Sequence, residues 1–230
     1  MGAAQDSAVT VARGSASGVG ARATWKTYTE DTPGVPGTHD TADRFGESLS
    51  AADITGDGID DLAVGLPGRE LGQDDDAGAV DILRGSRAGL TGEGAQSFTQ
   101  DTAGVPGAAE AHDAFGSAVE LLDINGNGYA DLAAAAVGED GNGAVWELRG
   151  RPTGIVTDAA LVFGPKAVGA PYAGAAFGSE LGWPALQKNL RGIPARLSIP
   201  SLLDRRTGER PERSRPRPTE ESPCPATCPS

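Results

Sequence analysis

Long apolar runs and cysteines are both scarce in this chain of 230 residues. No run of about 18 apolar residues occurs, so no membrane span is expected. The two cysteines, Cys224 and Cys228, lie together in a proline-rich tail, and one pair cannot staple a chain of this length. The opening segment, MGAAQDSAVTVARG, does not join a basic region to an apolar one, so the chain as given has no predicted signal peptide.

Basic residues are outnumbered, since 19 Lys and Arg stand against 32 Asp and Glu and give a formal net charge of −13. Binding to a nucleic-acid backbone needs clustered Lys and Arg, so we predict no nucleic-acid partner. A solvated acidic surface explains most of the acids. Lysine occurs only at 26, 166 and 188, and this scarcity beside abundant Ala and Gly indicates a GC-rich bacterial genome.

Residues with catalytic chemistry are few. The only histidines are His39, six residues before Phe45, and His112, three residues before Phe115, so they are not equivalent in the repeat described below. The sequence contains no G-x-S-x-G nucleophile elbow, and no glycine-rich segment ends in the Lys-Ser/Thr of a phosphate loop. We therefore predict that the chain is not an enzyme.

What the sequence does contain is a repeat. The stretch from Phe45 to Pro67, FGESLSAADITGDGIDDLAVGLP, returns at Phe115 as FGSAVELLDINGNGYADLAAAAVG, and the acidic loops that begin at Asp53 and Asp123 keep the same spacing. A third copy opens at Phe177 as FGSEL and then diverges. A fixed internal order at a long period is the signature of a repeat architecture.

Each repeat predicts four short strands. Strands are expected at 48–54 and 117–124 after Phe-Gly, at 61–66 and 131–137 after an acidic loop, then in the AVxxLRG segments, and last in polar segments such as SFTQDT. Alternation of apolar and polar residues marks half-buried strands, and the 34 glycines supply turns. Four antiparallel strands in about 60–70 residues make a propeller blade, so we predict an all-β, partial β-propeller of about three blades. A β-sandwich is the structural alternative.

The repeat also predicts how the chain is divided. We expect the last strands of a preceding blade plus a loop at 1–44, one blade at 45–114, a second at 115–176, the start of a further blade at 177–190 and a disordered Arg/Pro-rich tail at 191–230. Because a propeller closes by contact between its first and last blades, we expect a longer native protein or self-association through open blade edges. The loss of the repeat after Gly182 resembles a frameshift.

The acidic loops predict a metal. In both loops, side chains or carbonyls with oxygen fall at positions 1, 3, 5, 7 and 9, and glycine stands at position 6, which suits a hard cation such as calcium. Position 12 carries Val64 or Ala134 instead of the glutamate of an EF-hand, and a strand follows instead of a helix. The alternative is a glycine turn without metal. The predicted calcium ligands are Asp53, Thr55, Asp57, Ile59 and Asp61 in the first loop, and Asp123, Asn125, Asn127, Tyr129 and Asp131 in the second.

The two loops differ in ligand charge. The first offers three carboxylates among its predicted ligands, whereas the second offers two and replaces the others with asparagine. Because more ligand charge generally means tighter calcium binding, the first loop is predicted to bind more tightly.

These motifs resemble FG-GAP repeats, which occur in the β-propeller of integrin α subunits and in many secreted bacterial proteins. The resemblance covers residues 8–182 and is most specific in the first full repeat. It implies structural calcium ions in the loops and an extracellular, non-catalytic scaffold for binding or adhesion, whose protein or carbohydrate ligand it does not identify. It also implies a ring of seven blades. The alternative function is the accessory propeller of a secreted hydrolase whose catalytic domain lies outside this chain.

Overall fold

The computed structural model describes residues 7–181, apart from 13, 15, 17, 20–24 and 171–172. These residues belong to one compact unit, Met1–Pro184, and the second unit, Ala185–Ser230, lies outside them. The predictions for the Arg/Pro-rich tail, its two cysteines and the end of the third repeat therefore fall outside the described residues. Within the described part, no helix is long and apolar enough to cross a membrane.

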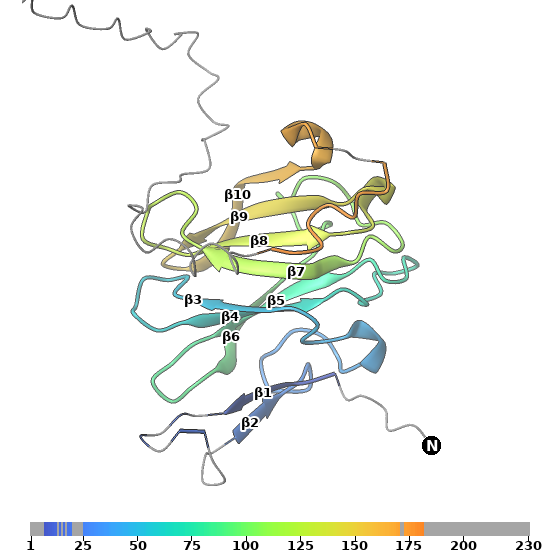
Figure 1. Ribbon diagram of the computed structural model, residues 1–230. Helices are drawn as coiled ribbons and strands as arrows, with labels where there is room; N and C mark the ends of the chain where they lie inside the picture. The colour runs from blue at the N-terminus through green and yellow to red at the C-terminus, as the bar shows by residue number, and fades with distance from the viewer. Residues whose placement is uncertain are drawn as a thin grey trace, which may run out of the picture. The chain divides into compact units, whose positions relative to one another are not determined.

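The described strands form three antiparallel sheets (Figure 1). Strands β1 (Val9–Ala12) and β2 (Trp25–Tyr28) pair with each other. The first blade contains, in spatial order, β3 (Leu49–Ala52), β4 (Asp61–Leu66), β5 (Ala79–Arg84) and β6 (Thr91–Phe98). The second blade repeats this order with β7 (Phe115–Leu122), β8 (Asp131–Ala136), β9 (Ala144–Arg151) and β10 (Gly154–Phe163).

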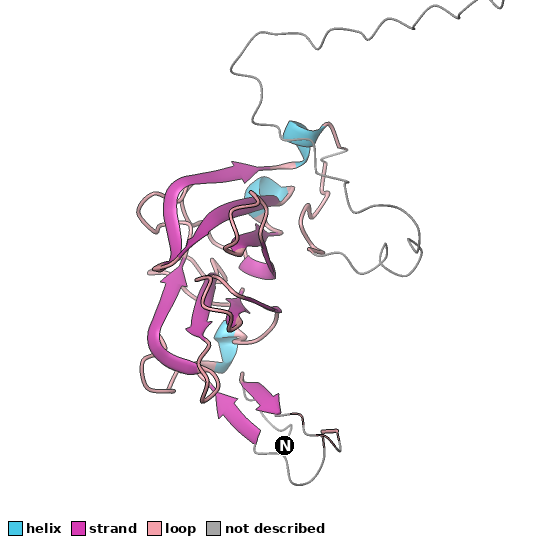
Figure 2. Cartoon of the chain, turned by 90° about the vertical axis from the view of Figure 1, so that its left-hand side faces the viewer, coloured by secondary structure: helices cyan, strands magenta, loops and turns pink. Residues whose placement is uncertain are grey.

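Three short 3-10 helices complete the regular structure of the described residues, and Figure 2 shows how small they are beside the strands: η1 (Thr41–Asp43), η2 (Glu139–Gly141) and η3 (Pro165–Val168). The prediction of an all-β partial propeller with four-stranded antiparallel blades is thereby confirmed.

The predicted strand bounds hold best next to the acidic loops. β4 matches its prediction, and β8 ends one residue early. The last strand of the first blade was predicted wrongly at SFTQDT, because β6 pairs with β5 from Thr91 and ends at Phe98. The following residues turn instead: the Thr99 N–H donates to the Thr102 hydroxyl (2.9 Å), and the Thr102 N–H donates back to the Thr99 carbonyl (3.1 Å).

Apolar clusters lie on both faces of the first blade. On one face, Val64 and Leu66 of β4 pack with residues of β1 and β2 in a cluster that includes Val9 and Tyr28. On the other face, Ala63 joins a larger cluster shared with the second blade. β4 is buried along its whole length for this reason, which explains why its sequence is continuously apolar after Asp61.

The Phe-Gly pair of the second repeat joins the two blades. Phe115 is fully buried, meets Trp146 edge to face at 5.4 Å between ring centroids, and donates its N–H to the Ala77 carbonyl (2.9 Å). The third Phe-Gly pair begins in a similar way, since the Phe177 N–H donates to the Asn142 carbonyl (2.8 Å). Each of these two pairs therefore docks on a connection of the preceding sheet.

Two serines of β3 and the turn before it strengthen the same junction. The Ser48 hydroxyl donates to the Gly116 carbonyl (2.8 Å), and the Leu121 N–H donates to the Ser50 hydroxyl oxygen (2.9 Å). These bonds join β3 to β7 across the blade boundary and bring the starts of the two acidic loops to the same side of the junction.

Candidate functional site

The first acidic loop is folded around the side chain of Asp53. Its Oδ1 accepts N–H bonds from Thr55 (3.2 Å), Gly56 (2.7 Å) and Asp57 (3.2 Å), and its Oδ2 accepts one from Gly58 (2.7 Å). Burial alone would raise the pKa of Asp53, but these four amides together lower it. Both glycines have positive φ, +75° and +81°, so the Gly-Asp-Gly sequence is what permits the turn. The carboxylate is held ionised at the first loop position.

Asp61 ends the first loop and is the first residue of β4. It is 2% exposed, its Oδ1 accepts the Gly85 N–H (2.7 Å), and the same atom lies 3.8 Å from Nε of Arg84. Its Oδ2 is buried and makes no hydrogen bond of regular geometry. Burial raises the pKa of Asp61, and the Gly85 amide, Arg84 and the nearby Ile54 amide oppose the shift only in part. Burying a carboxylate oxygen without a well-placed hydrogen-bond donor costs free energy unless a cation or a proton binds it.

The remaining predicted ligands of this loop sit between Asp53 and Asp61. Asp57 is exposed, and its Oδ1 accepts the Ile59 N–H (2.9 Å). Thr55 is 9% exposed and Ile59 is half-buried. Every side-chain donor atom in this set is an oxygen, which is the ligand type that calcium takes.

The second loop has a similar backbone arrangement, but the carboxylate at its ninth position receives hydrogen bonds from the loop's own residues. Asp123 accepts the N–H groups of Asn127 and Gly128 (both 2.9 Å), as Asp53 does in the first loop. Asp131 is fully buried, and both of its oxygens accept bonds from the Asn125 side-chain amide (2.8 and 2.9 Å). The N–H groups of Gly150 (2.9 Å), Ile124 (3.0 Å) and Asn125 (3.3 Å) complete its shell. No oxygen of Asp131 is left without a donor.

The two loops touch each other. The Ala130 N–H donates to the Asp53 carbonyl (2.9 Å), and the ring of Tyr129 covers Gly56 so closely that a side chain there would meet it. In the second loop, the Asn127 side-chain oxygen accepts the Tyr129 N–H (2.9 Å) and fixes the backbone next to that ring. The loops are therefore parts of one connected surface.

The structure positions the predicted ligands in two loops but does not gather their carboxylates closely. Within the described ranges, no three Asp, Glu, His or Cys side chains form a group that could hold a metal ion. The residues still fit a hard cation unequally: the first loop leaves a buried oxygen of Asp61 without a hydrogen bond, while the second fills that role with an amide of its own. The assignment of calcium ligands stays a prediction.

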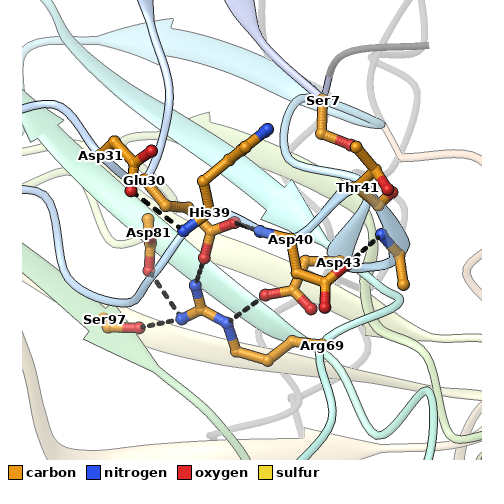
Figure 3. A network of polar contacts seen from close by, with 11 residues as sticks. Ser7, Glu30, Asp31, His39, Asp40, Thr41, Asp43, Arg69, Asp81 and Ser97 are labelled. Carbon is orange, nitrogen blue, oxygen red and sulfur yellow. Dashed lines mark hydrogen bonds and ion pairs between the residues drawn. The ribbon is translucent and has the colours of Figure 1, made fainter. Parts of the chain in front are cut away.

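A buried ion-pair network lies at the other end of the first blade (Figure 3). The Arg69 guanidinium contacts Glu30 through Nη2, Asp43 through Nε (3.1 Å), Asp81 through Nη1 (3.7 Å) and the Ser97 hydroxyl through Nη1 (3.5 Å). Two of these acids precede the blade, whereas Asp81 and Ser97 belong to β5 and β6. One cation thus joins the segment before the blade to β5 and β6.

Burial shifts the pKa values of this network. It raises the pKa of Glu30 to about 7 and that of Asp81 to about 6, and Arg69 opposes both shifts. Burial would lower the pKa of Arg69, but the charges of Asp81 and Glu30 raise it. The guanidinium is therefore firmly charged and compensates several carboxylates that have lost water.

Sequence reasoning did not find this network or the anchors of the acidic loops. Gly85 and Gly150, which end the predicted AVxxLRG strands, donate to Asp61 and Asp131 and fix the ninth loop positions. The repeated Arg-Gly dipeptide that precedes each hairpin turn was the available signal for them. Arg69 had no such signal, because the equivalent position of the second repeat holds Glu139.

The fold and its loops define a class, a repeat protein of propeller blades with an acidic loop between the first and second strand of each. A family model described as the FG-GAP repeat matches residues 45–83 and 115–148. The chain therefore contains two FG-GAP repeats, and each match begins at the Phe-Gly pair and ends in the third strand of its blade.

Integrin α chains are among the proteins to which this chain is similar. The chain is 32% identical to integrin alpha-PS2 of Drosophila melanogaster over 133 residues, which is 56% of this chain and 9% of the relative. It is 38% identical to integrin alpha-4 of Xenopus laevis over 121 residues, or 52% of this chain and 11% of the relative. It is 32% identical to integrin alpha-6 of Gallus gallus over 134 residues, or 58% and 12%. The chain thus matches about a tenth of the length of these relatives.

Proposed function

We propose that the chain is part of a cation-stabilised, non-catalytic propeller that serves outside the cell as a scaffold for binding or adhesion. The observation that supports the cation is the buried Asp61 Oδ2, which makes no hydrogen bond of regular geometry, in a loop whose candidate ligand atoms are all oxygens. Calcium is the cation that such a loop suits. The extracellular setting follows from calcium, because millimolar calcium saturates weak sites there. The likeness to integrin α chains supports a protein or carbohydrate partner and no catalysis.

Calcium should raise the melting temperature of the full chain over the value in chelator. A ligand that binds only the folded state stabilises it by about 2.7 kcal/mol at one hundred times its dissociation constant. Asp61→Asn should remove most of this gain and, in chelator, should be at least as stable as the parent, because it eliminates the buried charge. Thermal unfolding of both proteins checks whether the parent is the more stable one with calcium and loses that advantage in chelator.

Asp60→Asn is the matched control, because its side chain is exposed and stands at position 8 of the loop. It should keep the full calcium response. A calcium response that survives Asp61→Asn, or that disappears equally in Asp60→Asn, would contradict the assignment of the first loop as the main site.

Asn125→Asp should convert the second loop from a self-satisfied turn into one that depends on a cation. The substitution replaces the amide that donates to both oxygens of Asp131 with a like charge, so we expect a loss of about 1–3 kcal/mol in chelator. Calcium should recover part of that loss. Asn127→Asp is the control, because an aspartate there can still accept the Tyr129 N–H. Urea unfolding that ranks the two variants equally in chelator would refute the role of the Asn125 amide.

A further inference from the structure

The entrance of a blade is defined here as the segment before its first strand together with the connection between its second and third strands. The entrances of the two blades carry different charges at equivalent positions. When the repeats are aligned on Phe45 and Phe115, Glu30 corresponds to Gln100, Asp43 to Asp113 and Arg69 to Glu139. The first entrance contains a guanidinium bound to carboxylates. The second keeps the buried aspartate but replaces the cation with another acid, so the charge that compensated Asp43 has no counterpart beside Asp113.

The second entrance is short of hydrogen-bond donors. Gln100 is 1% exposed, and its Nε2 lies within bonding distance of the Glu139 Oε2 (2.7 Å), the Asp113 Oδ2 (3.1 Å) and the Ala108 carbonyl (3.4 Å). An amide nitrogen carries two hydrogens for these three acceptors. Among the described residues, the buried Gln100 Oε1 has no donor, and the Glu110 N–H also donates to Asp113 (3.0 Å). One more proton would complete the cluster.

Among the described residues, the charged groups that act most strongly on Glu139 are acidic. Asp113, Asp140 and Glu110 act on it with like charge, and its hydrogen bond with Gln100 is the single favourable contribution among these groups. The one nearby histidine, His112, is 72% exposed in its side chain and turns its Nδ1 to Asp76 (3.4 Å). The Trp146 indole N–H is committed to the Pro106 carbonyl (2.8 Å).

We propose that Glu139 is a proton-dependent latch that joins residues 99–114, the linker between the blades, to the second blade. With Glu139 protonated, one charge remains on the pair, and the new O–H supplies the missing donor to Gln100 or Asp113. With Glu139 ionised, the buried carboxylate of Asp113 and the half-buried carboxylate of Glu139 share one amide and repel, and the linker loosens from the η2 connection between β8 and β9. In the first blade the equivalent position holds Arg69, whose positive charge pairs with Glu30 and Asp43, so the like-charged pair of the second blade does not occur there.

The electrostatics agree with this geometry. Burial, and next the charge of Asp113, raise the pKa of Glu139 to about 7 from its ordinary 4.5. A group whose pKa is raised by folding stabilises the fold fully below its unfolded value and loses that contribution as the pH rises through the folded value. The latch therefore closes in mildly acidic solution and opens as the pH rises through about 7.

The test compares the full chain with Glu139→Gln, which resembles the protonated acid at every pH, by urea unfolding in chelator at pH 5 and pH 8.5. The ratio of the two folding equilibrium constants should change on the order of tenfold in favour of the variant as the pH rises, which corresponds to about one pKa unit for a half-buried acid. Asp140→Asn, an exposed neutralisation one residue away, should change this ratio much less. Parallel pH profiles for the parent and Glu139→Gln would overturn the proposal.

A second variant and a local measurement test the same proposal independently. Glu139→Arg copies the first entrance, since an arginine can pair with Asp113 as Arg69 pairs with Asp43, and it should also remove the part of the pH response that Glu139 contributes. At pH 8.5, amide hydrogen exchange in residues 99–114 should be faster in the parent than in Glu139→Gln. Equal exchange of that segment in the two proteins would show that Glu139 does not hold the linker and would refute the latch.

Discussion

Replacing Arg69 with methionine should lower the free energy of unfolding by about 3–5 kcal/mol, because removing one partner of a buried ion pair leaves charge without compensation. Three acids contact this guanidinium, and the side chain of Glu30 among them is 0% exposed. Methionine keeps most of the side-chain volume, so the loss measures charge more than packing. Urea unfolding at pH 7 gives the value.

Arg44→Met is the matched control. Arg44 pairs with Asp76 at 3.2 Å, but both side chains are nearly half exposed, 45% and 46%. An exposed pair of this kind contributes about 0–1 kcal/mol. If the two variants lose similar stability, the Arg69 network contributes no more than a surface ion pair.

The cost of Arg69→Met should also fall in acid. Burial has already raised the pKa values of Glu30 and Asp81 to about 7 and about 6, and loss of the arginine removes an influence that opposed both shifts. Protonation at pH 5 then neutralises these acids and relieves the variant more than the parent. The same unfolding experiment at the two pH values gives the difference.

Gly116→Ala should be the second severe change. Gly116 has φ of +86°, and a Cβ built there would overlap the carbonyl oxygen of Ala79 in the neighbouring blade. The left-handed backbone costs a residue with a side chain about 1–2 kcal/mol, and overpacking against backbone adds about 1–3 kcal/mol. We expect a loss of about 2–5 kcal/mol by thermal or urea unfolding.

Gly128→Ala separates the cost of the left-handed backbone from the cost of overpacking. Gly128 has the same φ of +86°, but a Cβ there would meet nothing within 4 Å. In chelator its loss should stay at the backbone value of about 1–2 kcal/mol. An equal loss at both positions would mean that the glycine of Phe-Gly is needed for its backbone angle alone, and that the close approach of the blades is readily relaxed.

The features that could be predicted from the sequence are the ones encoded by local order. Asp61–Leu66 is recognisable as a strand because the acidic loop precedes it and a proline stop follows it. The start of β6 could not be predicted, because TGEGAQ has no strand-like alternation and becomes a strand only by pairing with β5. The pattern of neighbouring residues carries no information about such pairing.

The candidate site likewise has features that local sequence order predicts and features that depend on contacts in the folded chain. Spacing alone predicted which loop positions carry oxygen, and the structure added that Asp61 keeps an oxygen without a hydrogen bond while Asn125 satisfies Asp131. Both aspartates occupy the ninth loop position, so the difference arises from Thr55 and Asn125 at the third. The Arg69 network was beyond prediction because its members are scattered through the sequence from Glu30 to Ser97, and Arg69 itself is not repeated in the second blade.

The docking of Phe115 on the connection between β4 and β5 has a consequence for the order of folding. Within each blade, every strand pairs with the next strand in the chain, so the hairpins close short loops at little entropic cost. The bond from Ser48 to Gly116, by contrast, joins residues that are far apart in the sequence. Contacts at long sequence separation slow folding. We therefore expect hairpins to form early and the burial of Phe115 between the blades to limit the rate, so that Phe115→Leu slows refolding more than a substitution confined to one hairpin.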